Sequence, residues 1–222
     1  MASILPFFWP RVLERVESPI SGEIKIVEEF GKRRMEIGGI TQSGGMVEKI
    51  WEKTAREIIK LSNYQIANCL ILGLGAGTAA KIISNIQYPI SNIKIAGVEI
   101  DPQIVNLGKK YFGLGEIPRL EIVIADTVRF INQLPIKQPA IKGFNLILVD
   151  IYQGRKIPPA CETPAFLENL KKLKKTLGLI IFNRLYGKNE REETEKFLQK
   201  CRKIFTEVEA KNAICNKMIF CR

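Results

Sequence analysis

The first part of the chain alternates between apolar and polar residues with the period of a β-strand. This alternation runs through Gly22–Ile40 on both sides of Phe30–Lys32 and predicts a β-hairpin. We expect Gln42–Gly45 to be a loop. From Met46 to Leu61 the apolar residues instead recur at helical spacing, which is typical of a helix with one buried face.

After residue 62 the pattern changes to short apolar runs separated by helical segments. The runs are apolar almost without alternation, as expected of parallel strands covered on both faces. They predict strands at Ala67–Leu72, Ile93–Val98, Leu120–Ile124, Phe144–Val149 and Leu177–Phe182. Helices are predicted near Gly77–Asn85, Pro102–Tyr111, Asp126–Gln133, Pro164–Lys175 and Glu190–Lys203. The C-terminal residues 205–222 predict two more strands joined by a turn around Asn212.

This order of elements predicts an α/β protein with a Rossmann-like, mostly parallel twisted sheet and helices on both faces. A small N-terminal β-hairpin segment precedes the sheet. We expect residues 1–62 to hold an N-terminal arm, the hairpin and a helix, and residues 63–222 to form the α/β domain. The opening MASILPFFWP lacks a basic start, so we interpret it as a docking arm, with Phe7, Phe8 and Trp9 in packing or in a homodimer contact. No apolar run approaches the ~18 residues of a membrane span.

The composition limits the chemistry. The chain has no histidine, which excludes Ser–His and Cys–His nucleophile systems and histidine metal sites. Proton transfer must then use a carboxylate, Lys, Tyr, Cys or water. The five cysteines form no CxxC pair, which predicts a reduced, cytoplasmic protein without a metal. We interpret Cys161 as a loop residue, since no base partner is visible.

The net charge is +11, and a basic surface can indicate nucleic acid as a partner. The lysine clusters at Leu170–Leu177 and Lys196–Phe205 instead fit amphipathic helices with lysine on the outer face. Solvated lysines explain the charge adequately, and nucleic-acid binding stays an alternative.

A glycine-rich turn, Gly73-Leu74-Gly75-Ala76-Gly77, follows the first long apolar strand. Glycine in this place lets a ligand approach the main chain at the start of a helix. Glu99 follows the next strand, where an acid can accept hydrogen bonds from both ribose hydroxyls. Asp101 precedes Pro102 as a helix cap. The turn lacks the GK[ST] of a phosphate-binding loop. It also has Ala80 where a dinucleotide fingerprint has its third glycine, although a nicotinamide dinucleotide remains an alternative.

Two more acids follow predicted strands. Asp126 either accepts a hydrogen bond from an adenine amino group or caps the next helix. Asp150 comes directly after a buried strand, in LILVDIYQG, where we expect it to face a ligand. Three acids at neighbouring strand tips around one glycine turn predict a nucleoside site with a reactive carboxylate beside it.

From about Gly22 to Phe182 the chain resembles the spermidine synthase family of aminopropyltransferases, which have the class I methyltransferase fold. The resemblance rests on MEIGGITQSGG, LILGLGAG, GVEIDP, ADTVRFI and LILVDIYQG. It implies that Gln42, the glycines Gly73, Gly75 and Gly77, Glu99 and Asp126 bind an S-adenosylmethionine-type donor, intact or decarboxylated. Asp150 would be the catalytic base that helps deprotonate the attacking amine.

The chain departs from the family pattern at positions that the resemblance links to cationic ligands. Ala76 and Gln153 stand where the family has acids, and Trp51 stands at a tyrosine position. Trp51, Tyr152 and Gln153 are weaker candidates for contact with the substrate.

Three hypotheses follow. The first is a spermidine-synthase-like transferase that moves an aminopropyl group to a small-molecule amine. The second is a methyltransferase that uses intact S-adenosylmethionine and an unknown acceptor, which Ala76 and Gln153 favour. The third is a non-catalytic protein that binds a nucleoside or nucleic acid.

Overall fold

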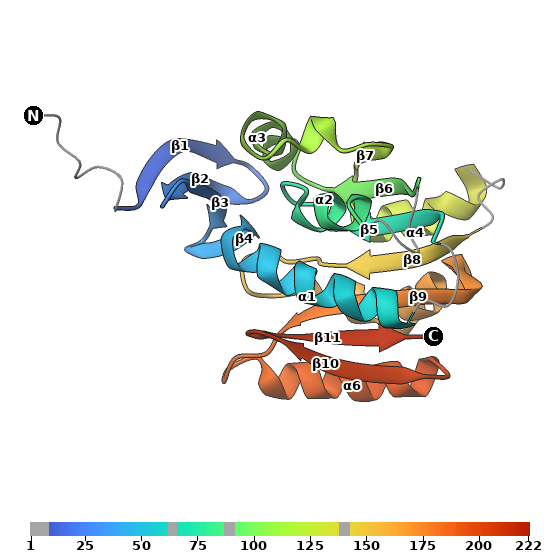
Figure 1. Ribbon diagram of the computed structural model, residues 1–222. Coiled ribbons are helices and arrows are strands. Elements are labelled where there is room, and N and C mark those ends of the chain that lie inside the picture. The colour runs from blue at the N-terminus through green and yellow to red at the C-terminus, as the bar shows by residue number, and fades with distance from the viewer. Residues whose placement is uncertain (1–8, 62–65, 87–91, 138–142) are drawn as a thin grey trace, which may run out of the picture.

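The computed structural model describes residues 9–61, 66–86, 92–137 and 143–222, and it contains two β-sheets (Figure 1). The N-terminal sheet is antiparallel and contains β1 (Arg11–Ser18), β2 (Gly22–Glu29), β3 (Lys32–Ile37) and β4 (Ile40–Gly44). The central sheet contains β5 (Asn68–Leu72), β6 (Lys94–Glu99), β7 (Leu120–Ile124), β8 (Phe144–Val149), β9 (Lys174–Leu185), β10 (Val208–Ala213) and β11 (Asn216–Cys221). The helices are α1 (Gly45–Leu61), α2 (Thr78–Ser84), α3 (Pro102–Phe112), α4 (Thr127–Lys137), α5 (Pro164–Leu173) and α6 (Arg191–Ile204), with 3-10 turns η2 (Leu114–Glu116) and η3 (Pro159–Glu162).

The central sheet has the strand order β10-β11-β9-β8-β5-β6-β7. The five strands from β9 to β7 are parallel, whereas β11 pairs antiparallel with β9 and β10 with β11. The chain runs from β5 outward to β6 and β7, and it then continues on the other side of β5 with β8. Ligands bind at such a reversal of strand order in open α/β sheets. The predicted α/β fold with a mostly parallel sheet and an N-terminal β segment is confirmed.

Helices cover the central sheet on both faces (Figure 1). Alternate residues of β5 show this directly: Cys69 and Ile71 belong to the core that includes α1 and α2, and Leu70 and Leu72 belong to the core that includes α4, α5 and α6. Because both of their faces are buried, β5 and β8 gain free energy from nearly every side chain, roughly 25 cal/mol per Å² of apolar area. This explains the absence of alternation in the sequence of β5 and β8.

The N-terminal sheet packs against α3 beside the central sheet (Figure 1). Ile24, Ile26 and Met35 are fully buried in a cluster with Ile104 and Leu107 of α3. The cluster fixes one end of the N-terminal sheet over the carboxyl ends of the central strands. The position of β4 follows from this, and β4 leads directly into α1.

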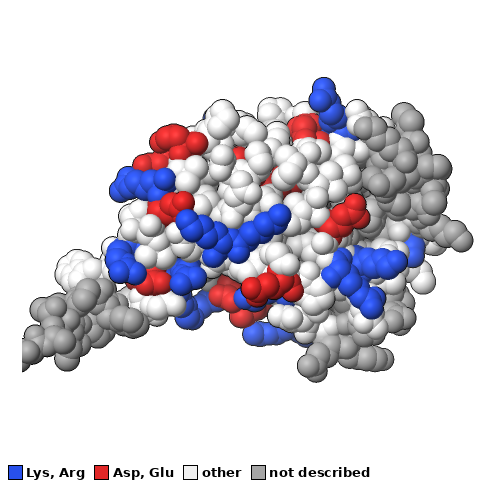
Figure 2. Space-filling model, turned by 90° about the horizontal axis from the view of Figure 1, so that it is seen from above, with Lys and Arg blue, Asp and Glu red and all other residues white. Residues whose placement is uncertain are grey.

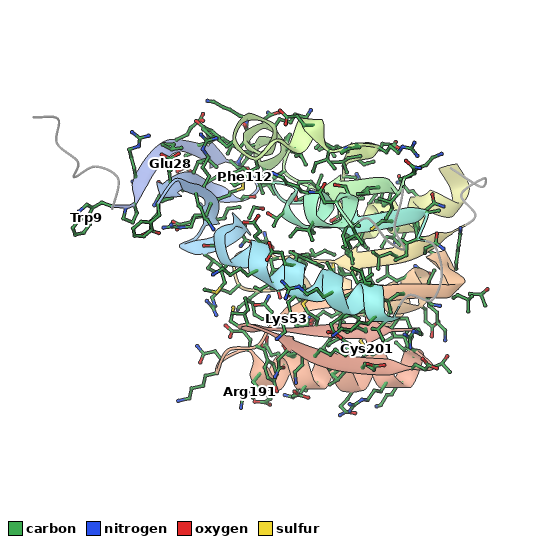
Figure 3. All side chains as sticks on the ribbon, viewed as in Figure 1. Trp9, Glu28, Lys53, Phe112, Arg191 and Cys201 are labelled. Carbon is green, nitrogen blue, oxygen red and sulfur yellow. The ribbon has the colours of Figure 1, made fainter. Side chains whose placement is uncertain are left out.

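Helix α1 packs on the central sheet, since its residues Ile50, Trp51 and Ile58 are buried in the same core as Ile71. The division of the chain at residue 62 stays a prediction. The expected docking arm lies mostly outside the described residues. Trp9 is 74% exposed and lies at the outer end of the N-terminal sheet (Figure 3). Among the described residues, no helix is both long enough and apolar enough to cross a membrane.

The structure corrects several predicted boundaries. Gln42–Gly45 was expected as a loop, but Gln42–Gly44 lie in β4 because they complete the pairing with β3. Strand β1, which pairs with β2, was not predicted. The helix expected to reach Lys175 ends at Leu173, since Lys174 already pairs with Phe144 of β8. Pairing with a neighbouring strand overrides the helical pattern in the lysine cluster.

The two C-terminal strands are as predicted, but their turn lies later than Asn212. Asn212 pairs with Lys217, and the turn is Ile214–Cys215, with Ile214 at φ 60°. This turn position places Asn216 at the start of β11.

Candidate active site

A cavity of about 300 Å³ opens at the carboxyl ends of β5, β6 and β8. The glycine turn and the strand-tip acids form one wall, and β4 and α1 form another. Nearly all of the residues that the sequence singled out line it: Gln42, Trp51, Gly73, Gly75, Glu99, Asp126, Asp150, Tyr152 and Gln153. The described lining does not include Gly77 or Ala76. Glu99 and Asp150 therefore face the same space, and that space is not filled by side chains.

Close packing within the protein explains why glycine occurs at the three positions of the turn. Gly73 (φ +83°) lies against the carbonyl of Asp150, and Gly77 (φ +92°) lies against Leu114, so a Cβ at either position would overlap these atoms. At Gly75 (φ +57°) a Cβ would lie 3.0 Å from the Ser43 hydroxyl. Close packing thus accounts for Gly77, and its contact with a ligand stays a prediction. Gly73 and Gly75 combine this packing with a place on the cavity wall.

The glycine turn also uses all of its own N–H groups. Gly73 and Leu74 both donate to the carbonyl of Val98, and Gly77 donates to the carbonyl of Leu74. Gly75 N–H donates to Glu99 Oε2 at 2.9 Å. Ala76 N–H donates to Ser43 Oγ at 2.9 Å. A turn that cradles phosphate leaves such donors free for the anion, so this geometry argues against the dinucleotide alternative.

Gly73→Ala is expected to lower the free energy of unfolding by about 2–4 kcal/mol, through steric overlap with Asp150 added to left-handed strain. Gly154→Ala is the matched control, because Gly154 has a similar φ of +63° but no heavy atom within 4 Å of the added Cβ. Gly154→Ala should lower the free energy of unfolding by only about 1–2 kcal/mol. Urea unfolding of both variants measures the difference, and equal losses would contradict the packing role of Gly73.

Glu99 is 7% exposed and its carboxylate organises the backbone around it. Oε1 accepts the N–H groups of Ile100 and Asp101, and Oε2 accepts that of Gly75. Burial raises the pKa of Glu99, and these backbone donors act against that shift. Oε2 retains accepting capacity toward the cavity, which is compatible with the ribose role that we expected.

Asp101 and Asp126 both cap helices. Asp101 is fully buried, accepts the Gln103 N–H at 2.9 Å, and accepts the Ser18 hydroxyl at 2.5 Å. Its expected structural role is therefore confirmed. Asp126 accepts the Arg129 N–H at 2.8 Å at the start of α4 and also lines the cavity. Contact of Asp126 with adenine stays a prediction.

Two side chains from distant parts of the chain hold the Asp150 carboxylate. Its Oδ2 accepts the Trp51 indole N–H at 3.2 Å, and its Oδ1 accepts the Asn183 amide N–H at 2.8 Å. Burial raises the pKa of Asp150 to about 6, the two donors oppose the rise, and the charge of Glu99 adds to it. Asp150 is thus mostly ionised at pH 7 but close to its titration range, as a general base requires.

Trp51, Tyr152 and Gln153 were expected to touch substrate. Trp51 is 1% exposed and its only donor is committed to Asp150. The Tyr152 hydroxyl donates to the Asn183 carbonyl at 3.0 Å and accepts the Leu185 N–H at 2.7 Å, so it is committed to β9. Gln153 is exposed and its backbone pairs with Lys156. The Trp51 and Tyr152 side chains are thus committed to other parts of the protein. Contact with substrate stays a prediction for all three residues.

Gln42 and Ala76 differ from their expected surroundings. The Gln42 amide donates to the carbonyl of Gly154 at 3.4 Å, which links β4 to the loop after Asp150. Ala76 is buried with Ile104 and Leu107 and not on the cavity wall. The side chain at position 76 therefore says little about which donor the cavity prefers.

The sequence analysis missed Ser43 and Asn183. Ser43 was assigned to a loop, although it is 1% exposed and accepts a hydrogen bond from the glycine turn. Asn183 follows the predicted end of its strand, yet β9 continues to Leu185 and buries it at 4% exposure. A polar residue at the end of an apolar run was the available signal, the same one that identified Asp150.

The cavity is acidic although the protein is basic. Its lining includes Glu99, Asp126 and Asp150, and no Lys or Arg occurs among the described residues that line it. On the face seen in Figure 2, basic and acidic side chains are interspersed. Carboxylates in a low-dielectric cavity attract cations more strongly than surface charges do. The arrangement therefore suits a positively charged ligand.

Comparison with known proteins gives a consistent picture. Residues 48–216 match the family model described as the spermine/spermidine synthase domain. A polyamine aminopropyltransferase of Vibrio vulnificus is 30% identical over 125 residues, which is 55% of this chain but only 39% of that enzyme. The eEF1A lysine and N-terminal methyltransferase of Bos taurus is 29% identical over 120 residues, 51% of this chain and 17% of that protein.

A solved structure supports the fold. The structure of a probable spermidine synthase from Corynebacterium glutamicum superposes with a TM-score of 0.76 at 17% identity, and the match covers 95% of this chain and 80% of that chain. At this identity the similarity concerns the fold.

Proposed function

Since the chain belongs to the spermine/spermidine synthase family, we propose that it is a transferase that uses an S-adenosylmethionine-type donor. In the favoured reaction it transfers an aminopropyl group to an amine, with Asp150 as the base. The observation that carries the proposal is the open, acid-lined cavity into which both Glu99 and Asp150 face.

The reaction needs alignment and one proton acceptor. The amine nitrogen attacks the carbon next to the sulfonium, a C–N bond forms, and the C–S bond breaks. Its electron pair neutralises the sulfonium and leaves the thioether methylthioadenosine. The amine must lose its extra proton to attack, and Asp150 accepts it because the carboxylate is ionised at pH 7. The remaining rate gain comes from holding donor and amine in line.

The electrostatics of the cavity favour the decarboxylated donor. Intact S-adenosylmethionine adds a carboxylate, which would meet Glu99, Asp126 and Asp150 without any Lys or Arg on the described lining. The N–H groups of the glycine turn are already engaged. A decarboxylated donor carries only positive charge at its reactive end and avoids this cost.

Titration calorimetry with the two donors tests this preference. Decarboxylated S-adenosylmethionine is expected to bind at least about tenfold more tightly than the intact form, the scale of leaving a charged group unpaired. Product analysis with an amine panel then identifies transfer. Tighter binding of the intact donor would reject the aminopropyl reaction. Absence of binding to either donor, together with salt-sensitive binding to RNA, would support a non-catalytic role.

Methyl transfer from intact S-adenosylmethionine is the second candidate. It is supported by the similarity to the eEF1A methyltransferase and by the neutral Gln153 on the cavity wall. The same calorimetry separates the two candidates, because only the methyltransferase needs to hold the carboxylate of the donor.

The remaining parts of the proposal follow from the sequence. We infer a small-molecule acceptor, no metal requirement and a homodimer formed through the N-terminal arm. Cytoplasmic location is supported by the five cysteines, which are all free.

A further inference from the structure

A line of hydrogen bonds leads from Asp150 to the C-terminal hairpin. Asn183 Nδ2 donates to Asp150 Oδ1 at 2.8 Å. Asn216 Nδ2 in turn donates to Asn183 Oδ1 at 2.6 Å, and the Cys215 thiol donates to Asn216 Oδ1 at 3.2 Å. Asn183 is 4% exposed and Asn216 is 5% exposed. Every bond in this line points its donor toward Asp150.

We propose that Asn216 is a positioning residue: it fixes the orientation of the Asn183 amide and so keeps a hydrogen-bond donor against Asp150. The inference deepens the proposed function, because it concerns the carboxylate that would act as base. Asn216 does not line the cavity, so it acts through Asn183 alone.

The physical reason is the two-sided chemistry of an amide. An amide presents a donor on one side and an acceptor on the other, with almost the same shape. If the Asn183 amide rotated by half a turn, its oxygen would face the Asp150 carboxylate, and two acceptors would repel. Asn216 prevents this, because its N–H needs the Asn183 oxygen. The Cys215 thiol orients the Asn216 amide from the other end.

The strand pairing brings the two asparagines together. Strands β9 and β11 are antiparallel, with Asn216 opposite Leu185 and Met218 opposite Asn183. Asn183 and Asn216 are therefore diagonal neighbours, within reach of side-chain hydrogen bonds. Both are buried, so water does not offer an alternative partner, and the amide orientation depends on the pair.

The other groups around Asp150 do not replace this donor. From α1, Trp51 donates to the opposite oxygen, Oδ2. From the end of β6, the Glu99 charge raises the pKa of Asp150. The Tyr152 hydroxyl next along the chain is turned to β9, and the Arg184 guanidinium is paired with Glu162. The Asn183 amide is thus the described group that lowers the proton affinity of Oδ1.

Trp51 provides a readout that does not depend on activity. Its indole N–H contacts Asp150, so its ¹⁵N–¹H resonance should move as Asp150 titrates, with a midpoint near the pKa of about 6. The chain has two tryptophans, and Trp9→Phe assigns the Trp51 signal because Trp9 is exposed. In Asp150→Asn the Trp51 resonance should no longer titrate in this range.

The decisive variant is Asn216→Asp in the Trp9→Phe background. An acceptor at position 216 draws the Asn183 N–H toward itself and turns the Asn183 oxygen to Asp150. The midpoint is expected to rise by about one pH unit, a tenfold change in proton affinity. Asn216→Leu removes the donor without adding a charge, and it should raise the midpoint by a smaller amount. It also provides the test if Asn216→Asp does not fold.

Asn212→Asp is the matched control, because it adds the same charge to an exposed position of the same hairpin. Its midpoint should equal that of the parent. An unchanged midpoint in both Asn216 variants would overturn the proposal, and so would an equal shift in the control. A chain that shows the shifts yet transfers no group to any amine would overturn only the proposed function, so the two failures are distinguishable.

Discussion

Replacing Asp150 with Asn is expected to lower the rate of the proposed aminopropyl transfer by about 10²–10⁴-fold, the range for removal of a general base. Donor affinity should change little, because Glu99 and the glycine turn remain intact. The amide keeps the shape of the carboxylate, but it cannot accept the proton of the amine. Single-turnover formation of methylthioadenosine measures the rate, and calorimetry measures the donor affinity.

Asp126→Asn is the matched control for this variant, since it makes the same chemical change at another acid of the cavity. Asp126 is exposed and caps α4. Its replacement should affect donor affinity more than the rate of the chemical step. If Asp150→Asn lost donor binding and rate to the same extent, Asp150 would be part of the scaffold and not the base.

The sequence was sufficient for the sheet and for the place of the cavity. Short apolar runs without alternation are typical of parallel strands that are buried on both faces. Strands β7 and β8 have the predicted bounds, although only β8 of the two is buried along almost its whole length. Acids that directly follow such strands must gather at one edge of the sheet. The sequence alone therefore predicted that Glu99 and Asp150 lie at one site.

The surroundings of Asp150 could not be predicted in the same way. Its two hydrogen-bond donors lie far along the chain, Trp51 at a separation of 99 residues and Asn183 at 33. Trp51 is one of the apolar residues that recur at helical spacing, a pattern that indicates a core residue. Asn183 lies beyond the predicted end of its strand. The local sequence of neither residue indicates a contact with Asp150. Each contact depends on how α1 and β9 pack against β8.

The glycine turn shows a second limit. Three glycines next to a strand favour a ligand that lies against the backbone, yet a Cβ at Gly73 or Gly77 would already overlap the Asp150 carbonyl or Leu114 of the protein itself. Ser43 then accepts the hydrogen bond of Ala76. Local sequence reveals that the backbone needs glycine, and only the tertiary structure reveals what lies against it.

Glu99→Gln is expected to weaken donor binding roughly 10- to 150-fold, which corresponds to the ~1.5–3 kcal/mol of a hydrogen bond to a charged group. The carboxylate now accepts backbone N–H groups with both oxygens and has capacity left for ribose. A glutamine has one oxygen and presents an N–H₂ group in place of the other. That group would oppose either the Gly75 N–H or the N–H groups of Ile100 and Asp101. Calorimetry with the donor measures the loss.

Glu121→Gln provides the control, because Glu121 is exposed on the neighbouring strand β7 and the substitution is the same. Its donor affinity should equal that of the parent chain. Thermal unfolding of both variants separates a local loss of the site from a general loss of stability, since the Glu99 variant also frees buried N–H groups. Unchanged donor affinity in a folded Glu99→Gln protein would show that binding of the donor ribose does not depend on this carboxylate. The donor would then have to occupy another part of the cavity.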